Sequence, residues 1–187
     1  MRKKILISIT GASGSIYSIR LLEALNSFNV ETHLIVSDGA KRIIEYETDF
    51  SLEAVVEKAH VFYEDLDLHA GPASGSFHID GMCVVPCSMK TLSAIAHGFC
   101  NTLTARAACC MLKENRTLVL TPRETPLDLP SLKNMVAARE AGAVILPAMP
   151  GLYHQPHDLN DLIDFIVGKI IDQFSIEHTL FKRWGEV

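Results

Sequence analysis

The sequence lacks the features of a membrane protein or a nucleic-acid-binding protein. None of its apolar runs approaches the ~20 residues that a membrane-spanning helix needs. No block of lysine or arginine stands out and the net charge is −5, so nucleic acid and anionic membrane are not expected partners. The basic start, MRKK, precedes no long apolar segment with a cleavage site, and we interpret it as the lead-in to a first strand.

Familiar metal, nucleotide and hydrolase motifs are also missing. The five cysteines include a CxxxC spacing and an adjacent pair but no zinc or thioredoxin pattern, so we expect reduced thiols in a cytoplasmic protein. The segment TGASGS is not GxGxxG, and no Gly-Lys-Ser/Thr follows it, which excludes a P-loop. There is no GxSxG motif and no cluster of metal ligands, so no metal is predicted.

The sequence does contain enough apolar material for one complete core. Of its 187 residues 48% are hydrophobic and 21% are charged, which predicts a single globular domain over 1–187 with a short C-terminal tail. Mean hydropathy is +0.20, which is high for a monomer in water. We therefore expect part of the apolar surface to be buried between subunits.

Apolar runs alternate with helical patterns along the chain. Strands are predicted at 3–10, 30–37, 60–64, 81–87, 116–122 and 143–148. Helices are predicted at 15–28, 39–47, 51–58, 88–97, 102–114 and 129–142, and a last helix begins after Asp158 and carries apolar residues as far as Phe174. Apolar strands separated by helices predict a three-layer, doubly wound α/β fold, whose parallel sheet is covered on both faces.

Such folds bind ligands at the carboxyl ends of their strands, so the residues there are the candidate site. TGASGS, residues 10–15, follows the first strand and opens a helix whose free N–H groups suit a phosphate. A tight turn capped by serine is the plainer alternative. Ser37 ends the second strand, and Ser88 to Thr91 follow the fourth. Asp38 could bind a ribose diol, which keeps NAD open beside a flavin.

The fifth predicted strand delivers Arg123 and Glu124 to its end, between Pro122 and Pro126. The prolines stiffen this loop because each fixes φ. Arg123 can neutralise anionic groups of a ligand. A carboxylate in a dry pocket can have its pKa raised toward neutral, which would let Glu124 carry protons. The alternative is an Arg/Glu pair at a surface turn.

Seven segments, taken in order along the chain, make it similar to the flavin prenyltransferase (UbiX) family, formerly described as an aromatic acid decarboxylase subunit. They are TGASG, ETD, ASGS, PCSMKTL, LVL.PRE.PL, LPAMPG.YHQP and RWGE. The resemblance covers nearly the whole chain. It implies that the doubly wound fold is flavodoxin-like or Rossmann-like, and that the assembly is a homododecamer.

The resemblance also implies a reaction. Members of the family transfer a dimethylallyl group from dimethylallyl monophosphate to reduced FMN, forming bonds at flavin N5 and C6 without a metal. The product, prenylated FMN, serves a UbiD-type decarboxylase as its cofactor. The implied partners of this chain are therefore FMN, the prenyl phosphate, further copies of the chain and that decarboxylase.

By position, the resemblance assigns roles to individual residues. FMN binding is implied for Gly11, Ala12, Ser13, Ser37, Ser88, Met89, Lys90, Thr91 and Arg123. Binding of the prenyl phosphate is implied for Tyr153, Lys169 and Arg106. Catalytic roles are implied for Glu124, Lys113 and Glu47. We expect some of these residues to reach the site from a neighbouring subunit.

The chain departs from the family pattern at three positions. Lys169 stands where many members have arginine, and a lysine cannot make the same bidentate contact with a phosphate. Ser131 and Lys133 replace a histidine and an acid.

Trp184, in the tail, would stabilise a carbocation-like species through π contacts, or would simply pack.

Two other functions stay open beside the NAD-binding alternative. One is a flavin-dependent cysteine decarboxylase of the same fold, although the catalytic histidine and the PASANT-type clamp of those enzymes are not visible here. The other is a non-catalytic flavin carrier. Intact Glu124, Tyr153 and Lys113 argue against a carrier without excluding it.

Overall fold

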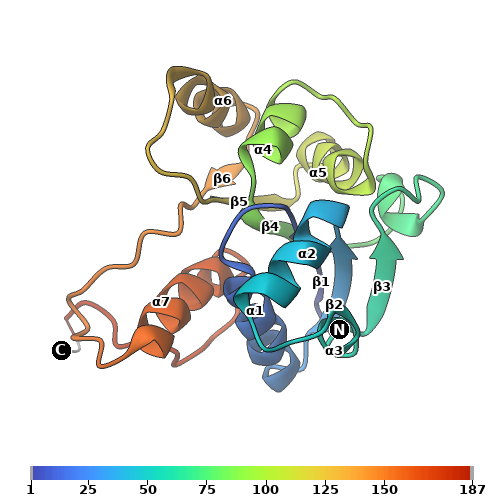
Figure 1. Cartoon of the computed structure of the whole chain (residues 1–187). Coiled ribbons are helices and arrows are strands. Elements are labelled where there is room, and N and C mark those ends of the chain that lie inside the picture. The colour runs from blue at the N-terminus through green and yellow to red at the C-terminus, as the bar shows by residue number, and fades with distance from the viewer. Residues whose placement is uncertain (1, 186–187) are drawn as a thin grey trace.

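The chain folds into three layers, with helices on both faces of one six-stranded parallel sheet (Figure 1). The computed structural model describes residues 2–185. The strands are β1 (Lys4–Ile9), β2 (Glu31–Val36), β3 (Val61–Glu64), β4 (Gly81–Cys87), β5 (Thr117–Pro122) and β6 (Val144–Ile145). The helices are α1 (Ser15–Ser27), α2 (Asp38–Glu47), α3 (Leu52–Val56), α4 (Met89–Ala96), α5 (Leu103–Lys113), α6 (Leu129–Glu140) and α7 (Leu159–Asp172), with one 3-10 turn, η1 (Gly71–Ala73). The predicted three-layer, doubly wound α/β fold is confirmed.

The strand order is β3-β2-β1-β4-β5-β6, so the sheet grows in one direction from β1 and in the other from β4. Without β3, the other five strands have the flavodoxin-like order, and β3 extends that order to the six strands of a dinucleotide-binding fold. In both, ligands bind beside the point where the order reverses. The relevant edge is therefore formed by the carboxyl ends of β1, β2 and β4.

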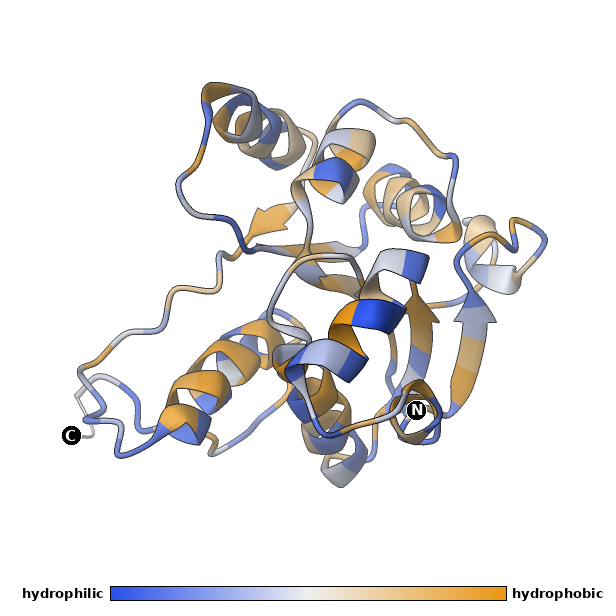
Figure 2. Ribbon diagram, viewed as in Figure 1, coloured by the Kyte–Doolittle hydropathy of each residue, from blue (hydrophilic) through white to orange (hydrophobic). Residues whose placement is uncertain are grey.

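Two apolar cores hold the layers together. One lies between the sheet and α1 with α7, and the other between the sheet and α4 with α5. Figure 2 shows how rich in hydrophobic residues the central strands and α7 are. Every residue of β4 is buried, because Met82 and Val84 enter one core while Cys83 and Val85 enter the other. Despite these apolar segments, no helix within 2–185 is long and apolar enough to cross a membrane.

The chain just after α7 lies at the amino-terminal edge of the sheet. A Cβ on Gly81, the first residue of β4, would be 2.6 Å from Cε1 of Phe174 and 3.2 Å from the carbonyl oxygen of Thr117. Lys3, just before β1, donates a hydrogen bond to the carbonyl of Phe174. The last turn of α7 is therefore far along the sheet from the carboxyl ends of the strands.

β6 is shorter than the strand expected over 143–148. Pro147 has no N–H for the ladder, so the regular strand stops before it. Leu146 and Ala148, on either side, still donate their N–H groups to carbonyls of β5 at 2.8 and 3.3 Å. The segment therefore stays beside β5 as an irregular edge before the loop that leads to α7.

Candidate functional site

A cavity of about 340 Å³ opens beside the point where the strand order reverses. Gly11 follows β1, Ser37 follows β2, Asp65 follows β3 and Ser88 follows β4, so four strand ends contribute to its wall. The rest of the wall is Asp38, Gly39, Leu66, Lys90, Thr91, Ala94, Asn101, Thr102 and Ala105. The volume lies within the ~300–1,000 Å³ typical of small-molecule sites.

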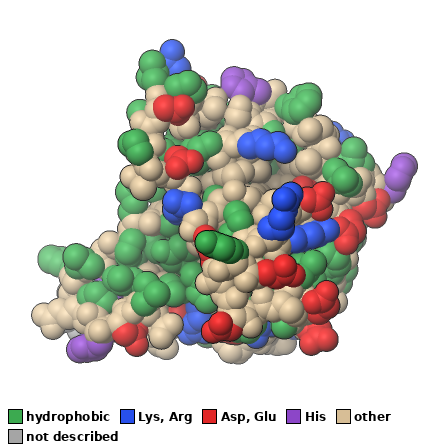
Figure 3. Space-filling view, viewed as in Figure 1, with side chains coloured by type: hydrophobic (Ala, Val, Ile, Leu, Met, Phe, Trp, Pro, Cys, Tyr) green, Lys and Arg blue, Asp and Glu red, His purple; other side chains and the backbone are tan. Residues whose placement is uncertain are grey.

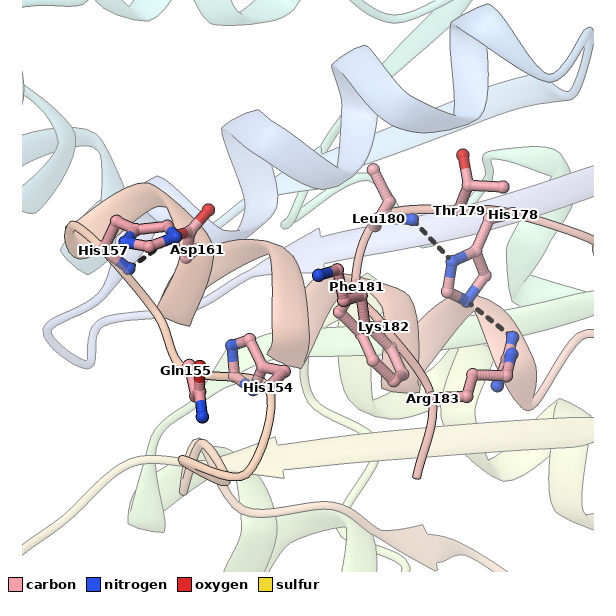
Figure 4. A pocket seen from close by; sticks show the side chains of 10 residues that line it. All are labelled: His154, Gln155, His157, Asp161, His178, Thr179, Leu180, Phe181, Lys182 and Arg183. Atoms are coloured by element: carbon pink, nitrogen blue, oxygen red, sulfur yellow. Dashed lines mark hydrogen bonds between the residues drawn. The ribbon is translucent and has the colours of Figure 1, made fainter. Parts of the chain in front are cut away.

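A larger hollow of about 470 Å³ lies between the loop before α7 and the C-terminal segment (Figure 4). Its lining comes from within 154–161 and 178–183 and includes no strand end. Because open α/β sheets bind ligands outside the carboxyl ends of their strands, the smaller cavity is the candidate site.

Three helices begin at the wall of this cavity. The side chains of Ser37, Ser88 and Thr102 cap α2, α4 and α5 by accepting backbone N–H groups at 3.2–3.3 Å. The amino ends of helices carry partial positive charge and suit an anion. Figure 3 shows lysine and arginine side chains gathered over α2 and α4. Within 88–91, Met89 packs against the core under α4 and α5, while the other three residues line the cavity.

Thr10 ties the loop after β1 to the loop after β4. Its hydroxyl donates to the carbonyl of Pro86 at 2.7 Å and accepts from the N–H of Ser88 at 2.8 Å. Thr10 is 1% exposed, so water does not compete for these bonds. The motif TGASGS contains Thr10, but nothing in its spacing indicates partners 76 residues away.

The loop after β1 and the start of α2 approach closely because each carries a glycine. A Cβ on Gly11 would be 3.4 Å from Cα of Gly39. Gly14, the N-cap of α1, has a φ of +107°, which glycine adopts with little strain. The predicted residues Gly11, Ala12 and Ser13 therefore form the tight turn beside the cavity.

Glu47 holds this turn from the end of α2. Its carboxylate accepts from the N–H of Gly14 at 2.8 Å and faces the hydroxyl of Ser15 at 3.5 Å. Glu47 is exposed, and although desolvation of its carboxylate against the turn would raise its pKa, the hydrogen bonds from the turn and the positive charge of Arg123 hold that pKa below the usual value. A carboxylate kept ionised in this way is suited to bracing the turn rather than to donating a proton.

We expect Glu47→Gln to lower stability near neutral pH and to flatten its decline in acid. A carboxyl group with a depressed folded-state pKa stabilises the fold above its unfolded pKa, about 4.3 for glutamate. That contribution is lost as the pH falls through the folded-state pKa. Melting temperatures between about pH 3 and pH 7 test this, with Glu45→Gln, an exposed position on the same helix, as control. Parallel pH profiles for all three proteins would contradict the bracing role.

Arg123 reaches the same turn from the end of β5. Its Nε donates to the carbonyl oxygen of Ser13 at 3.1 Å, and its backbone N–H lies 3.4 Å from the carbonyl oxygen of Cys87. The half-buried guanidinium has further N–H groups available for an anion. Arg123 therefore contacts the turn beside the cavity, although its side chain is not part of the cavity wall.

Glu124, in contrast, is exposed, and the expectation of a dry pocket around it is wrong for a single chain. Its carboxylate accepts a hydrogen bond from the N–H of the next residue, Thr125, at 3.1 Å. The physical reason is that the loop carries Glu124 beyond the end of β5, where no described segment of the chain covers it. Only another molecule can exclude water from this side chain.

Arg106 and Lys113 lie in a different part of the chain. Nε of Arg106 donates to the carbonyl of Ala73 in η1 at 2.9 Å, and Nζ of Lys113 is 3.5 Å from Glu114 Oε1. Lys113 ends α5 and is separated from β5 by three residues, whereas Arg123 directly follows β5. The six residues of β5 span about 20 Å at 3.3 Å per residue. One chain therefore does not bring Lys113 to the residues at the cavity.

Tyr153 and Lys169 form a third group, on the face of the sheet opposite α5. The ring of Tyr153 packs edge-on against Phe165 and Trp184, with centroids 5.8 and 5.3 Å apart. Nζ of Lys169 is 3.8 Å from the carboxylate of Asp172. The residues expected to bind a prenyl phosphate are thus divided between the two faces of the sheet.

The other departures from the family pattern lie at the start of α6. Ser131 is buried, and its N–H donates to the carboxylate of Asp128, the N-cap of the helix, at 2.9 Å. Lys133 is exposed on the same helix. The substituted serine is therefore part of the capped first turn, and nothing in the structure explains Lys133.

Asp38, on which the NAD alternative depended, turns mostly to solvent. Its side chain is 73% exposed and pairs with Lys41 at 3.1 Å, three residues later on α2. A ribose-binding acid would be expected to point into the cavity with its carboxylate free. The geometry of Asp38 does not favour that alternative.

Comparison with known proteins gives one consistent result. A model of the family described as Flavoprotein matches residues 1–171. The flavin prenyltransferase UbiX of Thauera aromatica is 50% identical over 181 residues, which cover 97% of this chain and 93% of that protein. The flavin prenyltransferase UbiX of Escherichia coli K12 is 46% identical over 185 residues, which cover 97% of this chain and 98% of that protein.

Solved structures agree. AnUbiX, crystallised with FMN and dimethylallyl pyrophosphate, superposes with a TM-score of 0.97 at 47% identity, covering 98% of both chains. A dodecameric, FMN-dependent UbiX-like decarboxylase from Escherichia coli O157:H7 superposes with a TM-score of 0.94 at 43% identity, covering 97% of this chain and 98% of that one. The peptidyl-cysteine decarboxylase EpiD, at 16% identity and a TM-score of 0.66, shares the fold alone. On these matches, which extend over nearly its full length, the chain belongs to the flavin prenyltransferase (UbiX) family.

Proposed function

We propose that this chain transfers a dimethylallyl group from dimethylallyl monophosphate to N5 and C6 of reduced FMN, and that the whole chain acts as one flavin-binding domain. The observation that carries the proposal is the cavity at the reversal point, where three capped helix N-termini meet a glycine turn. Membership of the UbiX family supplies the reaction. FMN and dimethylallyl pyrophosphate together in AnUbiX support FMN and a phosphorylated dimethylallyl donor as the two ligands.

The residues at the cavity fit a flavin mononucleotide. Its phosphate needs N–H donors and positive charge, which the turn at Gly11–Ser13 and the guanidinium of Arg123 offer. Its ribityl hydroxyls and ring edges need both hydrogen-bond donors and acceptors. The hydroxyls of Ser37, Ser88 and Thr91 can serve as either. We assign FMN binding to Gly11, Ala12, Ser13, Ser37, Ser88, Met89, Lys90, Thr91 and Arg123.

Reduced flavin, when bound, supplies the nucleophilic atoms, and the side chains manage charge and protons. Arg106, Lys113, Tyr153 and Lys169 would hold the phosphate of the donor and stabilise it as it leaves, in the place of a metal. Glu124 would accept a proton released at the ring and return one to the departing phosphate. Glu47, whose pKa is held low by its contacts with the turn, would brace the site.

A site of this kind needs more than one copy of the chain. Lys113 and Arg123 are separated by the length of β5, and Lys169 lies on the opposite face of the sheet from α5. Exposed apolar side chains at Met149, Leu152 and Leu159 offer surface for neighbouring copies, and the relative from Escherichia coli O157:H7 is dodecameric. We propose a homododecamer in the cytoplasm that supplies prenylated FMN to a UbiD-type decarboxylase.

The proposal is tested by anaerobic incubation of the protein with reduced FMN and either dimethylallyl monophosphate or the pyrophosphate, followed by mass spectrometry of the flavin. Gain of one dimethylallyl unit, less one hydrogen, is the expected result. FMN should bind and NAD should not displace it, because the carboxylate of Asp38, at the edge of the cavity, is mostly exposed and paired with Lys41. Unmodified flavin with both donors, or displacement of FMN by NAD, would refute the assignment.

A further inference from the structure

The C-terminal strap, residues 175–185, folds back along α7. The ring of Phe181 packs on Phe165 with centroids 4.9 Å apart, and the side chain of His178 is completely buried. A Cβ on Gly168 of α7 would lie 2.6 Å from both His178 Cε1 and Phe181 Cε1. A residue without a side chain at this point therefore lets the strap lie directly on the helix.

Asp172, the last residue of α7, holds the strap in place. Its carboxylate accepts from both terminal nitrogens of Arg183, at 2.8 and 3.2 Å, and from Nε2 of His178 at 3.1 Å. Such a paired contact with a guanidinium is among the stronger hydrogen-bonded arrangements in proteins. Burial would raise the pKa of Asp172, but Arg183, His178 and Lys169 together hold its pKa below the usual value.

The tautomer of His178 follows from its surroundings. The N–H of Leu180 donates to Nδ1 at 3.2 Å (Figure 4), so Nδ1 is an acceptor. Nε2 then carries the proton and donates it to Asp172, even when the ring is neutral. Nε2 of His178 and Nη2 of Arg183 both donate to Oδ1 of Asp172. These two donor nitrogens therefore lie only 3.5 Å apart.

The position of Asp172 at the end of α7 does not stabilise the helix. The carboxyl end of a helix carries partial negative charge, so an acid in the last turn is unfavourable by itself. Its three cationic or donating partners explain the residue: two from the strap and Lys169 from the preceding turn of α7. At 3.8 Å, the pair with Lys169 is an ion pair and leaves the ammonium N–H groups available to a further anion.

Both ends of this arrangement reach residues of the proposed donor site. Lys169 is one of them, and the strap brings Trp184 edge-on to the ring of a second, Tyr153, with centroids 5.3 Å apart. A lysine is a point charge on a flexible stem, so its position must be set by neighbours. Asp172 is the group that contacts both Lys169 and the strap.

We propose that Asp172 is a positioning residue for the prenyl phosphate: its carboxylate sets the position of Lys169 directly, and by fixing the strap on α7 it sets the position of Tyr153 through Trp184. The proposal rests on the proposed function, because it assigns the effect to the donor rather than to FMN. The contacts made by Asp172 are with Lys169 and the strap, and FMN is assigned to the cavity at the other edge of the sheet.

The test compares Asp172→Asn with Asp164→Asn. Asp164 is the matched control, because it lies on the same helix, is 21% exposed against 20%, and also binds an arginine, Arg20, at 2.6 and 3.1 Å. Asp172→Asn should raise KM for dimethylallyl monophosphate about tenfold, as expected for one lost charge-assisted contact. Its affinity for FMN should stay unchanged, and Asp164→Asn should keep the original KM.

A second measurement does not depend on activity. Trp184 is the only tryptophan of the chain, so its fluorescence anisotropy in the flavin-free protein reports the mobility of the strap. It should fall in Asp172→Asn and not in Asp164→Asn. Released strap with an unchanged KM, or equal changes in both variants, would overturn the inference. Failure of the unchanged protein to prenylate FMN would instead refute the proposed function, and the anisotropy would still show whether Asp172 holds the strap.

Discussion

Replacing Glu124 by glutamine is expected to lower turnover by about 10²–10⁴-fold, the range for loss of a group that transfers protons. Glutamine keeps the size and hydrogen-bonding ability of the side chain but cannot accept a proton as a carboxylate does. FMN affinity should stay near that of the unchanged protein, because Arg123 and the turn at Gly11–Ser13 remain. The hydrogen bond that the carboxylate of Glu124 accepts from the N–H of Thr125 can be kept by the amide oxygen.

The measurement is single-turnover prenylation under anaerobic conditions, with the mass and absorbance of the flavin followed in time. Glu140→Gln, which neutralises an exposed carboxylate at the end of α6, is the control and should turn over normally. Melting temperatures of the two variants should agree, since neither carboxylate is buried. Normal turnover by Glu124→Gln would assign the proton transfer to another residue.

Most of the fold could be predicted, because a strand that is buried on both faces of the sheet has a continuous apolar sequence. β4 is buried along its whole length, and its continuous apolar sequence indicated this directly. The apolar residues of 143–148 predict a longer strand than β6. Pro147 has no N–H for the ladder and β6 pairs with β5 alone, so the regular strand is shorter. Apolar character predicts burial, whereas the ladder depends on available N–H groups.

The candidate site was predictable only in part, for a related reason. The glycines and serines at the strand ends lie in short motifs, and the parallel sheet brings the motifs together. The bonds of Thr10 with Pro86 and Ser88 join segments far apart in sequence, and so does the contact of Glu47 with the turn at Gly14. No spacing rule applies to such pairs.

Resemblance to a family assigned Lys113, Arg123 and Lys169 to one site without regard to their separation in a single chain. β5 stands between the first two, and the sheet stands between α5 and the third. A donor phosphate is only a few ångströms across. If Lys113 and Lys169 contact one donor phosphate, they must come from different copies of the chain, as closed symmetric oligomers allow.

Two inactive variants, Lys113→Ala and Glu124→Gln, are therefore expected to restore each other in mixed oligomers. Each site would take Lys113 from one copy and Glu124 from another, because β5 separates the two positions within a copy. Random assembly from equal amounts leaves about a quarter of the sites with both residues intact in a symmetric oligomer. Coexpression with two different tags, followed by purification on both, yields the mixed oligomers for the prenylation assay.

The matched control is a mixture of Lys113→Ala with Arg106→Ala. Both residues lie on α5, near the segment 73–75, so one copy would contribute both to the same site. Every copy in that mixture lacks one of them, and activity should not exceed that of the separate variants. Recovery to about a quarter of the original rate in the first mixture and none in the second would establish a site shared between copies. No recovery in the first mixture would show that one copy supplies both Lys113 and Glu124, and full activity of Lys113→Ala alone would show that Lys113 works outside the site.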